Sequence, residues 1–172
     1  ILGGWTGGSN LNDVQYAKVN PADGTLGAWA TTTPFQTGRN ALAAAVFNGY
    51  LYVLGGWAGS ADQNDVQFAK LNADGTIGAW APTTPFVDAR NDFGTAVYNG
   101  YLFIYGGIRT GIGAAADVQS APFNPDGTLG PWSATAPVPS ARWSAGATTY
   151  ARYLYLLGGT TNGTDFSAET YV

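Results

Sequence analysis

The 172-residue sequence contains no cysteine, no histidine and no methionine. Without cysteine it can form no disulfide framework and has no thiolate chemistry. Without histidine or cysteine it lacks the Ser-His-Asp and Cys-His arrangements of nucleophilic catalysis, and with them nearly all zinc and copper sites. The acidic clusters do not have the spacing of a calcium-binding loop. We therefore expect a non-enzymatic chain with no catalytic residues, no metal site and no cofactor.

Charge is also scarce, with seven Lys and Arg residues against eleven Asp and Glu residues and a net charge of −4. Lys18 and Lys70 are the only lysines. This balance argues against a nucleic-acid partner or an anionic membrane surface, because both are bound mainly through clustered cations. The sequence also has no run of about 18 apolar residues, so we expect no membrane insertion.

Glycine is abundant, and its pairs mark an internal repeat. Each pair follows the previous one by 51 or 52 residues, and three other features keep the same step: an Asp-Val-Gln triplet, a tryptophan and an arginine. A period near 50 residues is typical of stacked supersecondary units such as propeller blades. The repeated residues are Gly3, Gly4, Gly55, Gly56, Gly106, Gly107, Gly158 and Gly159, then Trp29, Trp80 and Trp132, then Arg39, Arg90 and Arg142.

Each repeat reads as four antiparallel strands, here named a to d. In the second repeat we expect strand a at 43–47, strand b at 50–54, strand c at about 65–71 and strand d at about 78–82. Asn48-Gly49 separates two apolar, β-prone runs, which is a strong signal for a type I′ hairpin. No segment has sustained helical periodicity. The sequence therefore predicts an all-β protein in which a tryptophan ring packs against each Gly-Gly pair between neighbouring blades.

An apolar strand that ends in Gly-Gly, followed by a tryptophan, resembles the kelch repeat. The resemblance spans essentially the whole chain and implies a β-propeller with about three repeats. The longer turns that contain Asp-Gly are similar to those of repeats in secreted and cell-surface bacterial proteins, which implies an extracellular or cell-surface location.

We expect one propeller segment over residues 1–172, with blade remnants at 1–36, full blades at 39–86 and 90–137, and a partial blade at 142–172. Since propellers need at least about four blades to close, three repeats leave unpaired edges. The remaining blades would come from the same longer chain, which we favour, or from a second copy in a swapped six-bladed ring.

In kelch-like propellers the b–c and d–a loops project from one face, and that face usually binds. The b–c loops vary most between the repeats, as expected of a binding surface on a constant scaffold. Trp5 and Trp57 could stack on a sugar or hold a partner side chain, although rings in such positions more often cover their own blade. The candidate ligand-binding residues are Trp5, Trp57, Arg109, Asp62 and Asn162.

The repeated arginines could bind an anion, but their strict period favours a structural role in which they bond loop carbonyls between blades. The repeated aspartate of Asp-Val-Gln suggests hydrogen bonding at a turn or strand edge. We expect a non-catalytic module that contacts a protein or a glycan through the b–c and d–a loops. Two alternatives remain: a structural subunit of a surface assembly, and part of a propeller enzyme whose catalytic groups lie outside this chain.

Overall fold

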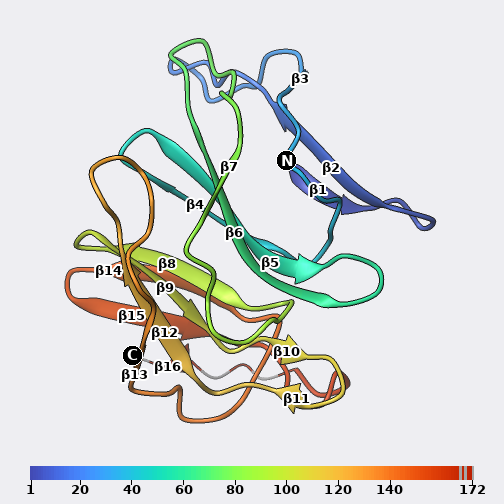
Figure 1. Cartoon of the computed structure of the whole chain (residues 1–172), viewed down its shortest axis with the longest axis vertical. Helices are drawn as coiled ribbons and strands as arrows, with labels where there is room; N and C mark the ends of the chain where they lie inside the picture. The colour runs from blue at the N-terminus through green and yellow to red at the C-terminus, as the bar shows by residue number, and fades with distance from the viewer. Residues whose placement is uncertain (167, 169, 172) are drawn as a thin grey trace.

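The computed structural model describes residues 1–166, 168, 170 and 171. These residues form four antiparallel sheets of three or four strands, a two-stranded ribbon and, within that part of the chain, no helix (Figure 1). The sheets contain, in chain order, β1 (Leu2–Trp5), β2 (Asn10–Tyr16) and β3 (Ala30–Thr32); β4 (Ala43–Phe47), β5 (Tyr50–Trp57), β6 (Asp62–Lys70) and β7 (Ala81–Thr83); β8 (Gly94–Tyr98), β9 (Tyr101–Tyr105), β12 (Val118–Pro122) and β13 (Ser133–Thr135); and β14 (Gly146–Tyr150), β15 (Tyr153–Leu157) and β16 (Thr170–Tyr171). A small ribbon of β10 (Ile108–Arg109) and β11 (Gly113–Ala114) extends the loop between β9 and β12.

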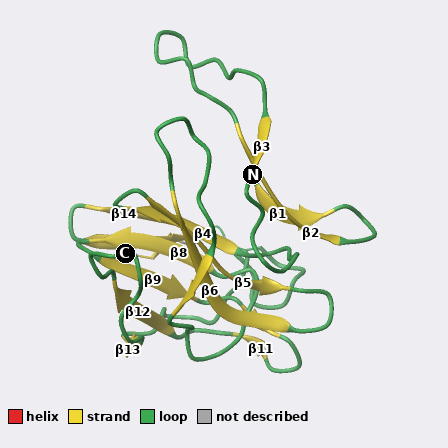
Figure 2. Ribbon diagram, turned by 45° about the horizontal axis from the view of Figure 1, so that its top comes forward, coloured by secondary structure: helices red, strands yellow, loops and turns green. Residues whose placement is uncertain are grey.

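Strand order in each sheet follows the chain, so every sheet is a meander. The first strands of neighbouring sheets contact one another, β4 with β8 and β8 with β14. The sheets are therefore arranged side by side with their a strands innermost, which is the arrangement of propeller blades (Figures 1 and 2). The all-β, four-stranded fold class is confirmed, while the predicted blade limits stay a prediction.

The hairpins between strands a and b form where the sequence places Asn-Gly. Asn48 and Gly49 have φ of 47° and 79°, and Asn99 and Gly100 have 48° and 78°. Positive φ at both central positions is the requirement of a type I′ turn. In the last hairpin Ala151 takes φ of 56°, a conformation that costs an alanine more than an asparagine.

Apolar residues form three clusters, one between each pair of consecutive sheets. Tyr52, Leu54 and Ile104 are fully buried in the middle cluster. Because each inner sheet is covered on both faces, its b strand is apolar throughout rather than alternating. Packing between blades, not within a single blade, therefore supplies the core.

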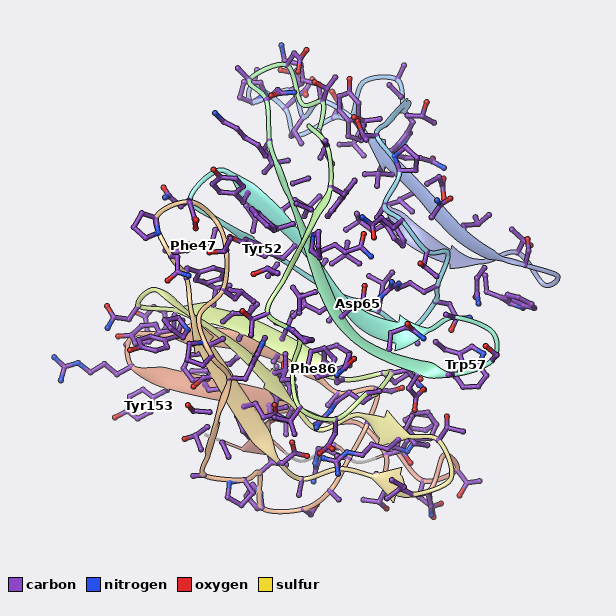
Figure 3. All side chains as sticks on the ribbon, in the orientation of Figure 1. Phe47, Tyr52, Trp57, Asp65, Phe86 and Tyr153 are labelled. Carbon is purple, nitrogen blue, oxygen red and sulfur yellow. The ribbon has the colours of Figure 1, made fainter. Side chains whose placement is uncertain are left out.

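The repeated tryptophans do not lie against the Gly-Gly pairs, so that prediction is wrong. A Cβ at Gly55 would lie 2.8 Å from the rings of both Phe86 and Phe93. Phe86, from the following d–a loop, lies in the interior in Figure 3. Trp80 instead packs edge-to-face on Phe35 of the preceding sheet, 6.1 Å between centroids.

Trp29 is the exception among the three tryptophans, because it is 52% exposed. No sheet of the described chain precedes the first one, so its indole has no neighbour to pack on. The segment that carries it, between β2 and β3, projects furthest from the sheets (Figure 2).

Candidate functional site

The b–c loops lie at one end of the molecule, opposite the a–b hairpins (Figure 1). The d–a loops return to the same end, where their main chains pair with the b–c loops. In the second blade Asn40 and Trp57 exchange two backbone hydrogen bonds, of 3.1 and 2.8 Å. We call this end of the molecule the loop face. It consists of the b–c loops, residues 5–10, 57–62, 106–117 and 158–166, and of the d–a loops, residues 33–42, 84–93 and 136–145.

A buried arginine holds each complete blade together beneath the loop face. The Arg39 guanidinium donates to the carbonyls of Thr37 and Gly55, at 3.1 and 3.0 Å, and to both oxygens of Asp65, at 2.5 and 3.0 Å. Arg90 repeats this pattern in the next blade, with Asp117 as its carboxylate partner. One side chain thus joins the d–a loop to strands b and c of the same blade. Figure 3 labels Asp65, which lies on β6.

The glutamine of Asp-Val-Gln extends this network to the preceding blade. Gln67 donates to Asp65 at 2.8 Å and accepts from the main-chain N–H of Gln36, in the preceding d–a loop, at 3.0 Å. Gln119 does the same with Asp117 and with the N–H of Val87. The repeated triplet is therefore a contact between blades.

Hydrogen bonds keep Asp65 and Asp117 in their ionised form. Burial acts to raise the pKa of Asp65, but hydrogen bonds from Arg39 and Gln67 and the charge of Arg39 outweigh it, so the pKa is lowered. The pKa of Asp117 is lowered in the same way against burial, by Arg90, Gln119 and Arg109. Both carboxylates stay ionised at neutral pH and are committed to their arginines.

The equivalent aspartate of the first blade and arginine of the last blade make the following contacts. Asp13 accepts from Gln15 at 2.5 Å, while its Oδ1 is buried and has no hydrogen-bond partner among the described residues. Arg142 donates to Gly158 O at 2.7 Å and to Ser140 Oγ at 2.8 Å. Glu169, which occupies the aspartate position of the last repeat in the sequence, lies outside the described residues.

Two of the sequence candidates, Trp5 and Trp57, line one hollow of the loop face. Together with Asn40 and Gly59 they surround a volume of about 360 Å³. Trp5 is 55% exposed, and Trp57 is partly buried at the end of β5 (Figure 3). Asn40 donates a 2.7 Å hydrogen bond to Asn10. The lining of the hollow therefore combines two indole rings with one polar side chain held in place.

Asp62 and Arg109 line a second hollow, of about 410 Å³, between the second and third blades. Arg109 forms ion pairs with Asp88, at 3.3 Å, and with Asp117. Asp62 accepts from Asn91 at 2.6 Å and from the N–H of Thr110 at 2.7 Å. The charge of Arg109 is thus compensated within the protein, and the exposed oxygens of this hollow suit a hydrogen-bond donor or a cation better than an anion.

The remaining candidate, Asn162, lies apart from both hollows. Its Oδ1 accepts from the N–H groups of Thr164 and Asp165, both at 3.0 Å, which makes it the centre of a local turn. The binding roles of all five candidates stay predictions. Within the described residues, no three acidic side chains gather as metal ligands would, and no helix could cross a bilayer.

Sequence reasoning overlooked the apolar residues at the loop tips. Ile112 is 80% exposed between β10 and β11, and Val87 and Phe166 are 69% and 70% exposed in neighbouring loops. The signal was available: each is a large apolar residue in a loop.

Comparisons with known proteins agree with the repeat. A family model for the kelch motif matches residues 38–67, the stretch that carries Arg39, the Asn-Gly hairpin, the Gly-Gly pair and Asp65. The solved structure of YjhT superposes with a TM-score of 0.69 over 90% of this chain and 47% of that chain, at 13% identity. The chain thus contains a kelch motif at residues 38–67, and its fold is similar to that of YjhT.

Two curated relatives also carry the kelch name. Kelch-like protein 15 of Mus musculus is 25% identical over 162 residues, which cover 86% of this chain and 26% of the relative. Kelch repeat and BTB domain-containing protein 12 of Homo sapiens is 28% identical over 123 residues, 65% of this chain and 19% of the relative. The chain thus spans about a quarter or less of the length of these relatives. Kelch repeats commonly mediate protein interactions.

Proposed function

We propose that this chain is a non-catalytic binding module whose loop face contacts a protein. One observation supports this above the others. The repeated polar side chains are used up inside the blades, whereas the side chains exposed at the loop tips differ from repeat to repeat and include large apolar residues. Variation on a rigid scaffold is how binding surfaces are usually built.

The composition of the loop face favours a protein partner. Trp5, Val87 and Ile112 are separate exposed apolar side chains on three loops. Asp62 and Asp88 line the same hollow as Ile112, and the charge of Arg109 is partly compensated by Asp88 and Asp117. Aromatic and aliphatic anchors surrounded by polar groups are the usual composition of a protein interface.

A glycan is the second candidate ligand, and the hollow between Trp5 and Trp57 supports it. An indole face can stack on a sugar ring, and Asn40 offers a polar group beside it. An extracellular or cell-surface location would bring either ligand within reach and is part of this proposal. Cell fractionation followed by surface labelling tests the location.

The non-catalytic part of the proposal is supported by how the carboxylates are used. Asp65 and Asp117 are bound to arginines that hold their pKa values low, so neither is suited to donate or accept a proton near neutral pH. A structural subunit, or part of an enzyme with catalytic groups elsewhere, remains the alternative reading.

Site-specific photo-crosslinking tests the binding face. A photoreactive residue replaces Ile112 on the loop face or, as the matched control, Tyr150, which is 75% exposed at the opposite end of the blades. We expect a discrete protein adduct from position 112 and none from position 150. Equal crosslinking at both positions would contradict the proposal.

The partner identified in this way is then titrated against Trp5→Ala and Trp57→Ala. We expect at least about tenfold weaker binding if either ring is an anchor, with unchanged unfolding midpoints. A panel of soluble glycans that quench tryptophan fluorescence, with no protein adduct, would instead favour the glycan reading.

A further inference from the structure

The loop between β5 and β6, residues 57–62, separates the two hollows of the loop face. Its first part, at Trp57 and Gly59, lines the hollow of about 360 Å³ that is shared with the first blade. Its second part, at Ser60 and Asp62, lines the hollow of about 410 Å³ that is shared with the third blade. An extended segment of a partner that crosses this one loop can therefore place one side chain in each hollow.

Asp62 is fixed in the second hollow by two uncharged donors. Its Oδ1 accepts from the side-chain amide of Asn91 at 2.6 Å, and its Oδ2 accepts from the N–H of Thr110 at 2.7 Å. Among the residues that the structure describes, no lysine or arginine forms an ion pair with it. A carboxylate has about four lone-pair sites, so each oxygen can accept one more hydrogen bond. Asp62 is therefore a fixed negative charge with unused accepting capacity.

The first blade makes the same loop contact without a charge. Asn10 is the equivalent of Asp62 in the register of strands b and c. Its Oδ1 accepts a 2.7 Å hydrogen bond from Asn40, which corresponds to the bond between Asp62 and Asn91. An amide oxygen can thus join the b–c loop to the d–a loop as a carboxylate does. The negative charge of Asp62 is therefore not needed for this contact.

Negative charge exceeds positive charge around the second hollow. Three carboxylates lie in it or beneath it, those of Asp62, Asp88 and Asp117, against the two guanidinium groups of Arg90 and Arg109. Arg90 is fully buried, whereas the side chain of Asp88 is 50% exposed. The charge that a partner meets here is therefore mainly negative, which attracts a cation and disfavours an acidic segment.

The apolar part of the same lining suits the stem of a basic side chain. Ile112 is 80% exposed there, and Ala61 and Ala89 also line the hollow. Lysine and arginine pack their aliphatic stems on apolar surface while the charged head stays among polar groups. A bare calcium ion would need about six to eight oxygen ligands, and no three acidic side chains of the described chain gather in that way. The hollow therefore fits a basic side chain better than a metal ion.

We propose that the protein partner presents a basic segment to the loop face. A lysine or arginine side chain of that segment enters the hollow lined by Asp62, Asp88 and Ile112, and an apolar residue of the same segment packs between Trp5 and Trp57. The unused lone pairs of Asp62 accept from the cation, and the indole rings bury the apolar side chain. This inference rests on the proposed function, because it names the chemistry of the partner.

The first test is the selection of a random peptide library, displayed on phage, against the purified 172-residue chain. We expect the bound peptides to be enriched in lysine or arginine next to a large apolar residue. Bound peptides without a basic preference, or with an acidic one, would overturn this inference and leave the proposed function intact. If no peptide is selected and position 112 gives no protein adduct in the photo-crosslinking experiment, both are overturned.

Asp62→Asn tests the charge without removing the loop contact, since Asn10 occupies the equivalent position in the first blade. A selected basic peptide should bind this variant at least about fivefold more weakly, with an unchanged urea midpoint. Asp74→Asn is the matched control. It removes the same charge at an exposed turn beside the a–b hairpin, where the N–H of Leu71 bonds the carbonyl of Gly49, and should leave binding unchanged. Equal affinities of Asp62→Asn and the unaltered chain would overturn the inference.

A double-mutant cycle then places the basic side chain. Its replacement by glutamine in the peptide should cost less affinity with Asp62→Asn than with the unaltered chain, because the two groups interact directly. Equal losses would show that the basic residue lies elsewhere and would overturn the inference. Calcium chloride that displaces the peptide, where sodium chloride of the same ionic strength does not, would assign the hollow to a metal ion and overturn it as well.

Discussion

Replacing Arg39 with methionine tests whether the buried arginine is the main polar support of a blade. The guanidinium is 1% exposed and makes four hydrogen bonds, two to main-chain carbonyls and two to Asp65. Methionine fills much of the same volume but donates none of them. The carbonyls of Thr37 and Gly55 would lose the Arg39 donor, and the Asp65 carboxylate would keep only the hydrogen bond from Gln67.

Removing one partner of a buried ion pair costs about 3–5 kcal/mol. Asp65 is 38% exposed, so water can partly replace the lost donor and the cost lies near the lower bound. We expect Arg39→Met to lower the free energy of unfolding by about 3 kcal/mol. That is a large part of the 5–15 kcal/mol that stabilises a typical domain.

The measurement is urea unfolding at pH 7, followed by tryptophan fluorescence and extrapolated linearly. Arg90→Met is the internal comparison: Arg109 still pairs with Asp117 in that blade, so the loss should be about 1 kcal/mol smaller. A double-mutant cycle with Asp65→Asn isolates the pair. A loss below about 1 kcal/mol for Arg39→Met, or no coupling in the cycle, would refute the reasoning.

Three further predictions concern acid stability, the last hairpin and the contact between turns. Folding lowers the pKa values of Asp65 and Asp117. The stability that they contribute is therefore present above the unfolded carboxyl pKa of about 4 and is lost as the pH falls through their folded pKa values. Unfolding midpoints measured from pH 7 to pH 2 should show this loss, and midpoints that stay constant would contradict it. Ala151→Gly should raise the free energy of unfolding by about 1 kcal/mol, because φ is 56° there; thermal unfolding that shows no gain would count against strain in this hairpin. Gly75→Ala should cost more than Gly24→Ala, since only the Gly75 Cβ would meet a tyrosine ring, at 2.8 Å; the difference in urea midpoint measures the crowding, and equal losses would contradict it.

Much of the fold could be predicted from the sequence because its signals are local. Strand a lies at Ala43–Phe47 as predicted, and the Asn-Gly turns adopt the positive φ values that those residues favour. Strand b continues past its predicted end to Trp57, because Gly56 still pairs with Gln63 after a bulge. A glycine pair marks the end of a strand in most sequences, so the bulge could not be foreseen.

Contacts between residues distant in the sequence were the ones that the sequence did not reveal. The rings against Gly55 belong to Phe86 and Phe93, and which rings approach it depends on how one sheet is rotated against the next. The arginine was expected to bond loop carbonyls between blades; it bonds carbonyls within its own blade instead, and its carboxylate partner Asp65 is 26 residues away. That Trp5 and Trp57 share a hollow follows from the stacking of two blades, which periodicity alone does not specify in detail.

The buried network and the loop face are physically connected, and this connection explains how one scaffold can hold loop tips whose exposed residues differ between repeats. Arg39 bonds the carbonyl of Gly55, two residues before Trp57, and the main chain of Asn40 pairs with Trp57 itself. The base of the loop is therefore fixed by side chains that never reach the surface, while the tip is free to vary. Substitutions at the base should change stability and binding together, whereas substitutions at Trp57 or Ile112 should change binding alone.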